Sequence, residues 1–194
     1  VVWHDLITPD LAQSKAFYGD VFGWQFKQVN DSYLLATSDG QLIAGMAELD
    51  NKQNASHWLS MLSTDNIAAI SEKTVTAGGK VLIASTEIKG RGSIAVFSLI
   101  NTVNGDPAAT YSDNRWIWQE VWTDNPEQSQ SFYQSLGNYS VQTKTLGENN
   151  YKYLTADNKP AIGFVKKPDT NIGNTWVNYI KVANISDTLL KVKA

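Results

Sequence analysis

Two stretches of this chain decide its fold because they are copies of one another. Residues 3–18 read WHDLITPDLAQSKAFY, and residues 118–133 read WQEVWTDNPEQSQSFY. Six positions are identical at a spacing of 115 residues, and Asp5 is replaced by another acid, Glu120. A second match, HWLSMLSTDNI from His57 and TWVNYIKVANI from Thr175, follows at a spacing of 118 residues. A repeat of this length indicates a tandem duplication.

Each half is itself doubled more faintly. Asp10-Leu11-Ala12 recurs 56 residues later as Asn66-Ile67-Ala68, which divides the chain into four quarters. The first quarter predicts a strand over 1–8, a helix from the cap Asp10 to the stop Gly23, and strands over 24–29, 33–37 and 42–48. Each quarter therefore reads as one strand, one helix and three strands.

The later quarters follow the same order. The second predicts a strand over 57–63, a helix ending at Ala77, and strands over 80–84, 94–99 and 108–112, and the third covers 116–167. Only the first strand and part of a helix of a fourth quarter precede Ala194, so we expect a truncated module with an exposed sheet edge. The predicted domains are 1–112, with two modules, and 116–194, with one complete and one truncated module.

The order of these motifs resembles one known family. HDL and TPD within 4–10, FY and VFGW within 17–24, GGKVL at 78–82 and IAVF at 94–97 are similar to blocks of the vicinal-oxygen-chelate superfamily, the glyoxalase/bleomycin-resistance/dioxygenase group. The resemblance implies an α+β fold of paired βαβββ modules whose curved mixed sheets enclose a cavity. It also implies, in many members, a divalent metal in that cavity. The superfamily includes metal-dependent enzymes and metal-free drug-binding proteins, so the fold alone does not choose a function.

In metal-binding relatives a ligand lies seven residues before the Asp that opens the helix. The equivalent positions here are Trp3, Leu59, Trp118 and Val177, and none offers an imidazole, carboxylate or thiolate donor. A further ligand in relatives is a Glu on the last strand of a module, where Asp106 fits under only one of two alignments. The residues at these positions therefore predict no metal site.

The chain has two His and no Cys, so any metal would need carboxylates for most of its ligands. His4 adjoins the position of Trp3, but successive strand residues point to opposite faces, so His4 is expected against the helix layer. His57 is two residues from Leu59 and is expected at the rim of the cavity face. A structural role is the simpler interpretation of both.

Strand alternation places an acid between apolar residues in each half. Trp3, Asp5 and Ile7 share one face, as do Trp118, Glu120 and Trp122, and these six are the candidate ligand-binding residues. An indole wall suits a flat or apolar ligand, and the carboxylate suits a hydrogen-bond donor or a cation. Two alternatives stay open: the acids satisfy nearby backbone or basic groups, or one acts as a general base.

The amino-acid composition indicates a globular protein and limits the partners that it could bind. The 194 residues are 42% hydrophobic and 18% charged, which is typical of a globular chain. The net charge of −3 argues against nucleic acid or an anionic membrane as partner, and the sequence contains no apolar run long enough to span a membrane. The abundance of Asn, Gln, Ser and Thr favours an exported protein over a cytoplasmic one only slightly. Gly78-Gly79 predicts a helix-stop turn, and residues 89–92 predict a solvated basic loop.

These observations favour a metal-free protein that binds a small organic molecule in an aromatic-lined cavity. The alternative is a metal-dependent lyase or dioxygenase of the same superfamily, with Mn, Fe, Ni or Zn as its cofactor. A third interpretation is an interaction protein, in which the fold serves a homodimer and Trp side chains fill the cavities. Metal content separates the first two, and an open pocket beside Trp3 or Trp118 separates both from the third.

Overall fold

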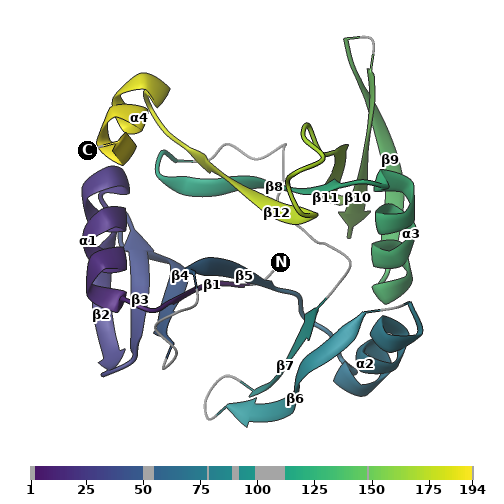
Figure 1. Cartoon of the computed structure of the whole chain (residues 1–194), viewed down its shortest axis with the longest axis horizontal. Helices are drawn as coiled ribbons and strands as arrows, with labels where there is room; N and C mark the ends of the chain where they lie inside the picture. The colour runs from purple at the N-terminus through teal and green to yellow at the C-terminus, as the bar shows by residue number, and fades with distance from the viewer. Residues whose placement is uncertain are drawn as a thin grey trace. The chain divides into compact units, whose positions relative to one another are not determined.

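A computed structural model describes residues 3–49, 55–77, 79–88, 92–98, 112–147 and 149–193. Its elements run in the predicted order (Figure 1). They are β1 (Trp3–Thr8), α1 (Leu11–Phe22), β2 (Gln25–Asn30), β3 (Tyr33–Ser38), β4 (Gln41–Glu48), β5 (His57–Met61), α2 (Ile67–Thr76), β6 (Lys80–Ile88), β7 (Gly92–Ser98), β8 (Arg115–Thr123), α3 (Pro126–Leu136), β9 (Tyr139–Leu146), β10 (Asn149–Ala156), β11 (Lys159–Lys166), β12 (Thr175–Lys181) and α4 (Ile185–Lys193).

The predicted helix ends of the first quarter are confirmed. The side chain of Asp10 accepts a hydrogen bond from the backbone N–H of Gln13 at 2.8 Å, which caps the start of α1. Gly23 ends the helix in the left-handed conformation, with φ of 69°, where a side chain would be strained. β1, α1 and β2 to β4 then complete one βαβββ module.

Two five-stranded mixed sheets organise the chain. One has the strand order β2-β3-β4-β1-β5 and the other β12-β8-β11-β10-β9. β1 runs parallel to β4 and antiparallel to β5. Each sheet therefore consists of four strands from one quarter and the first strand of the next quarter. The α+β class and the curved mixed sheets are confirmed.

The chain forms two compact units that are not its sequential halves. Unit 1 comprises residues 1–62, 109–117 and 179–194, and unit 2 comprises 63–108 and 118–178. Each unit therefore draws on both predicted domains. The boundaries 1–112 and 116–194 remain a prediction about the duplication, and each unit is described by itself.

The core of unit 1 is built around aromatic rings. Trp24 is only 3% exposed and stacks on Tyr18, with ring centroids 5.1 Å apart. Trp58 and Trp116 meet it edge-on, and the indole N–H of Trp24 donates to the carbonyl of Asn114 at 2.8 Å. The phenol oxygen of Tyr18 accepts from the indole N–H of Trp58 at 2.9 Å. These contacts join the first quarter to later segments of the chain.

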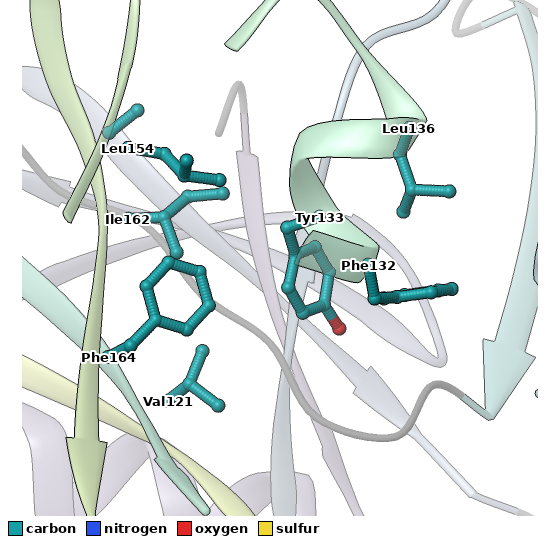
Figure 2. Close-up of a cluster of buried hydrophobic side chains, with 8 residues drawn as sticks. Val121, Phe132, Tyr133, Leu136, Leu154, Ile162 and Phe164 are labelled. Atoms are coloured by element: carbon teal, nitrogen blue, oxygen red, sulfur yellow. The ribbon is translucent and has the colours of Figure 1, made fainter. Parts of the chain in front are cut away.

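The core of unit 2 packs α3 against its sheet (Figure 2). The buried side chains are those of Val121, Phe132, Tyr133, Leu136, Leu154, Ala161, Ile162 and Phe164. Tyr133, the counterpart of Tyr18, is fully buried, and its hydroxyl has no hydrogen-bond partner within the described part of the chain. Burial raises the pKa of Tyr133 well above 10, so this hydroxyl stays protonated.

The remaining elements extend the predicted pattern. β6 and β7 pair as an antiparallel hairpin, and β6 is longer than the predicted 80–84. The strand expected over 108–112 lies outside the described residues except for Ser112, and Asp106 and the loop 89–91 lie outside them as well. The predicted strand and helix of the fourth quarter are confirmed as β12 and α4. Within the described residues, no helix is long and apolar enough to cross a membrane.

Candidate functional site

The acid predicted on the first strand lies in a hydrogen-bonded cluster. Asp5 is 5% exposed, and its Oδ1 accepts from Trp3 Nε1 at 2.8 Å and from the Tyr33 hydroxyl at 2.7 Å. Ile7 follows on the same strand face, whereas His4 and Leu6 point to the side where α1 packs. The structure thus brings Trp3 and Asp5 into direct contact, together with a tyrosine from β3.

A glycine makes room for this arrangement. Gly45 on β4 is the parallel partner of Asp5, and a Cβ atom at Gly45 would overlap both the carboxylate of Asp5 and the hydroxyl of Tyr33. A glycine inside a strand often marks such a close approach. We call Trp3, Asp5, Tyr33 and Gly45 the unit 1 cluster.

The second half repeats the arrangement around Glu120. Its Oε1 accepts from the Tyr151 hydroxyl at 2.7 Å and from Trp118 Nε1 at 3.2 Å, and its Oε2 accepts from Trp122 Nε1 at 3.2 Å. Trp118 Nε1 also donates to the Tyr151 oxygen at 2.7 Å. Gly163 is the parallel partner of Glu120, and a Cβ there would overlap the Tyr151 hydroxyl. We call these five residues the unit 2 cluster.

Sequence reasoning missed four members of the two clusters. Tyr33 and Gly45 recur as Tyr151 and Gly163 at the spacing of 118 residues that the second sequence match had already shown. That spacing, together with a glycine inside each strand, was a usable signal. What it did not reveal is the register, which brings the tyrosine hydroxyl to the acid across the one strand that separates them.

The two clusters differ in their neighbours. Position 7 is Ile, but its counterpart is Trp122. Position 35 is Leu, but its counterpart is Tyr153. Tyr153 stacks near Tyr151, with centroids 6.1 Å apart, and meets Trp118 edge-on at 6.5 Å. Unit 2 thus surrounds its acid with four aromatic side chains that are all partly exposed.

The histidines lie where strand alternation placed them. His4 is buried on the helix side, with its ring 5.0 Å from that of Trp116 and its Nδ1 3.2 Å from Ser60 Oγ. Burial lowers the pKa of His4 to about 4, so the ring is neutral at pH 7. His57 is exposed and pairs with Ile7 across β5 and β1, which puts it on the face that carries Asp5.

The residues at the family's metal positions do not fit a metal ion. Leu59 is the antiparallel partner of Asp5, and Trp3, Trp118 and Val177 occupy the other three positions. Indole and alkyl side chains have no lone pair to give a divalent ion. Within the described ranges, no three His, Asp or Glu residues group so that they could hold one.

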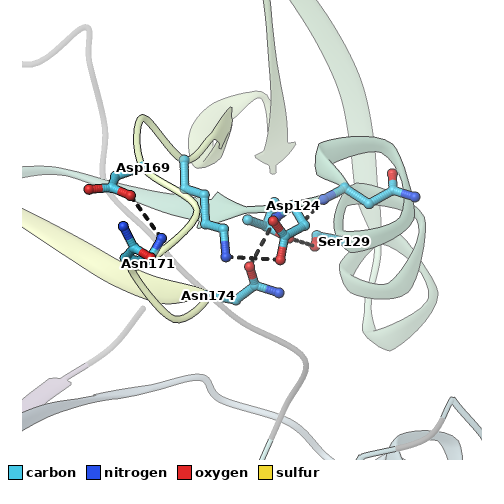
Figure 3. Close-up of polar contacts among 8 residues, drawn as sticks. Asp124, Ser129, Asp169, Asn171 and Asn174 are labelled. Atoms are coloured by element: carbon cyan, nitrogen blue, oxygen red, sulfur yellow. Dashed lines mark hydrogen bonds and ion pairs between the residues drawn. The ribbon is translucent and has the colours of Figure 1, made fainter.

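The strand ends next to the clusters are anchored to the helices. In unit 2, Ser129 Oγ donates to Thr123 Oγ1 at 3.1 Å, and the backbone N–H of Asp124 donates to Asn174 Oδ1 at 2.9 Å (Figure 3). Lys167 Nζ lies 2.9 Å from Asp124 Oδ2. In unit 1 the corresponding hydroxyl oxygens, those of Thr8 and Ser14, lie 2.8 Å apart and form the same hydrogen bond. The side chain of Lys167, which is only 7% exposed, therefore forms an ion pair just beyond the end of β8.

These features define a class of protein: tandem βαβββ modules with an acid and a tryptophan on the first strand. The model of the Glyoxalase/Bleomycin resistance protein/Dioxygenase superfamily matches residues 1–98, which is just over half of the chain. The chain belongs to this superfamily.

Relatives and a solved structure agree with this assignment. The putative glyoxylase CFP32 of Mycobacterium tuberculosis is 25% identical over 213 aligned residues, covering 99% of this chain and 80% of the relative. The anthracycline biosynthesis protein DnrV of Streptomyces peucetius is 33% identical over 114 residues, covering 50% of this chain and 42% of DnrV. The Mn(II)-bound glyoxalase from Novosphingobium aromaticivorans superimposes with a TM-score of 0.56 at 14% identity, covering 97% of this chain and 67% of that one. This last likeness shows the fold alone.

Proposed function

We propose that this protein binds a small organic molecule directly, without a metal ion, on the sheet faces that carry Asp5 and Glu120. One observation supports this most. At the strand positions where metal-binding relatives place a ligand, both halves carry a tryptophan that donates to an acid two residues later. The duplicated arrangement thus provides aromatic surface and a fixed carboxylate in place of metal donors.

The chemistry of these groups suits small-molecule recognition. Ligand sites typically combine apolar and aromatic walls with a few fixed polar groups that orient the ligand. The tyrosine and tryptophan donors hold each carboxylate in one orientation, so little ordering is needed when a ligand binds. The alternative, a metal-dependent lyase or dioxygenase, would need ligands that the four metal positions do not supply.

Metal content provides the first test. The protein is purified without chelator, incubated with manganese, iron, nickel or zinc, dialysed, and measured by elemental mass spectrometry. We expect well under one metal ion per chain in every case. Near-stoichiometric retention of one metal, abolished by Asp5→Asn or Glu120→Gln, would overturn the proposal and favour the metal-dependent enzyme.

Ligand binding provides the second test. The indole N–H signals of the nitrogen-15-labelled chain are recorded during titration with a neutral flat probe, 2-naphthol. We expect the signals of Trp118 and Trp122 to shift saturably, and Trp122→Ile to weaken binding about tenfold because it removes one aromatic wall. Trp116→Phe, which alters the core of unit 1 instead, is the matched control. Probe-independent spectra would refute binding at this face.

A further inference from the structure

We infer that the unit 2 cluster selects an organic cation, namely a protonated or quaternary amine carried on an apolar body. This inference rests on the proposed function, because it names the ligand class of one of the two faces. The unit 1 cluster is not expected to share the preference.

The carboxylate of Glu120 lies among aromatic donors. Glu120 is only partly buried, and its two oxygens accept hydrogen bonds from Trp118, Trp122 and Tyr151. These three donors, among the described contacts of Glu120, belong to aromatic side chains: two indole N–H groups and one phenol hydroxyl. A ring whose N–H or O–H donates to a carboxylate is polarised, so its face becomes more electron-rich. Each of these bonds therefore strengthens the attraction of the ring for a cation.

The rings beside Glu120 are inclined to the plane of Trp118. Trp118 is tilted by 52° to Tyr151, with centroids 6.3 Å apart, and by 78° to Tyr153, with centroids 6.5 Å apart. Rings at steep angles to one another present faces in several directions. A cation is attracted when it lies within about 6 Å of a ring centroid, and several ring faces around one point form the aromatic cages that recognise quaternary ammonium groups.

Unit 1 has an acid with two aromatic donors, but it has fewer rings around that acid. Ile7 and Leu35 replace Trp122 and Tyr153, so aliphatic groups stand where unit 2 has rings. Asp5 is 5% exposed, so its carboxylate is more buried than that of Glu120. Unit 1 therefore serves as an internal control, because it has an acid at the same strand position but lacks the rings of Trp122 and Tyr153.

On β9, β10 and β11, one basic residue shares the sheet face that carries Tyr151 and Tyr153. Lys144 on β9 is the antiparallel partner of Tyr151, so its side chain starts on the same side of the sheet. Lys144 is exposed, where solvent and salt screen its charge, and β9 is separated from the strand of Glu120 by β11 and β10. The partly buried carboxylate among the rings is thus the stronger determinant, and an anionic ligand becomes an outcome of the test.

The experiment compares two probes of the same shape. Phenyltrimethylammonium is positively charged, and tert-butylbenzene is its neutral isostere. Each is titrated into the full nitrogen-15-labelled chain, and the indole N–H signals of Trp118 and Trp122 are followed. We expect the cation to bind at least about tenfold more tightly than the isostere. Glu120→Gln is expected to remove that difference, whereas Asp31→Asn, in an exposed turn outside both clusters, leaves it intact.

The outcomes separate this inference from the proposed function. Equal binding of the two probes would overturn the cation preference and leave a neutral aromatic site. Tighter binding of benzenesulfonate than of the cation, lost in Lys144→Gln, would overturn it in favour of an anion. No shift with these probes or with 2-naphthol would refute both. If Glu120→Gln fails to fold by circular dichroism, the double variant Trp122→Ile/Tyr153→Leu, which installs the residues of unit 1, carries the same expectation.

Discussion

The two units hold an acid at the same strand position but differ in what surrounds it. Asp5 and Glu120 each face a glycine on the neighbouring parallel strand and each accept from a tyrosine hydroxyl. Beyond that common framework, unit 1 has aliphatic neighbours and unit 2 has rings. The comparison teaches that the duplication preserved the device that positions the carboxylate, while the positions that would touch a ligand diverged.

The two cores differ in how their buried polar groups are hydrogen-bonded. In unit 1 two polar groups on the helix side have partners: Tyr18 accepts from Trp58, and His4 lies within hydrogen-bond distance of Ser60. In unit 2 the hydroxyl of Tyr133 is buried, and no described residue pairs with it. The tyrosine at this helix position is therefore hydrogen-bonded in unit 1, whereas in unit 2 it is packed without a described partner.

The largest effect is expected from removing Trp24 from the core of unit 1, compared with removing its counterpart Tyr139 in unit 2. Trp24→Ala should lower the free energy of unfolding by about 3–5 kcal/mol, because Trp24 is fully packed among other rings. Its counterpart Tyr139 is only half-buried, so Tyr139→Ala should cost about 1–2 kcal/mol. Urea unfolding, with hydrogen exchange to assign the loss to one unit, measures both. Equal losses would refute the contrast between the cores.

Acid should weaken unit 1 selectively through His4. The pKa of His4 is about 4 in the folded chain and 6.5 in the unfolded chain, because burial disfavours the charged ring. The unfolded chain therefore binds more protons between these values. The stabilisation is complete above pH 6.5 and falls by roughly 3 kcal/mol in all as the pH drops to 4.

The counterpart of His4 is Gln119, which does not titrate, so His4→Gln is the informative variant. It should flatten the dependence of unfolding free energy on pH between 7 and 4.5, measured by urea denaturation. The carboxylates titrate in both proteins, so the difference between wild type and variant isolates the histidine. Parallel curves would contradict the assignment of a neutral, buried His4.

The smallest effects on the free energy of unfolding are expected from removing the hydroxyl of Tyr18 or of Tyr133, and they should differ in sign. Tyr18→Phe removes the acceptor of the Trp58 indole N–H and should cost about 1–2 kcal/mol. Tyr133→Phe removes a buried hydroxyl for which no described residue is a partner, so it should be neutral or slightly stabilising. Thermal and urea unfolding of the matched pair checks this. A substantial loss on Tyr133→Phe would mean that its hydroxyl is satisfied after all.

Local features of the fold were predictable from local chemistry. Asp10 and Gly23 are cap residues, so they fixed the ends of α1 in advance, and alternation along β1 separated His4 from Asp5 correctly. The predicted faces of Trp3 and Trp118 followed from the same period of two. The role of these faces in ligand binding stays a prediction.

The contacts that complete the two clusters could not be predicted from the sequence of any single strand. Tyr33 meets Asp5 only because β3, β4 and β1 align in one particular register, and nothing within either strand specifies that register. The segments that form each unit could not be predicted either, because Trp24 packs on Trp116, which is more than ninety residues away in the sequence. Such pairings depend on the whole chain, whereas sequence periodicity reports one element at a time.

The bond from the Trp24 indole to the carbonyl of Asn114 has a consequence for synthesis on the ribosome. All five strands of the first sheet lie within residues 3–61, so they are synthesised before Asn114 and Trp116. Its aromatic core must wait for Asn114 and Trp116, and for Ile180 near the end of the chain. During that interval a nascent chain would present tryptophan surface to its surroundings, and a chaperone that binds exposed aromatic residues would find its target there.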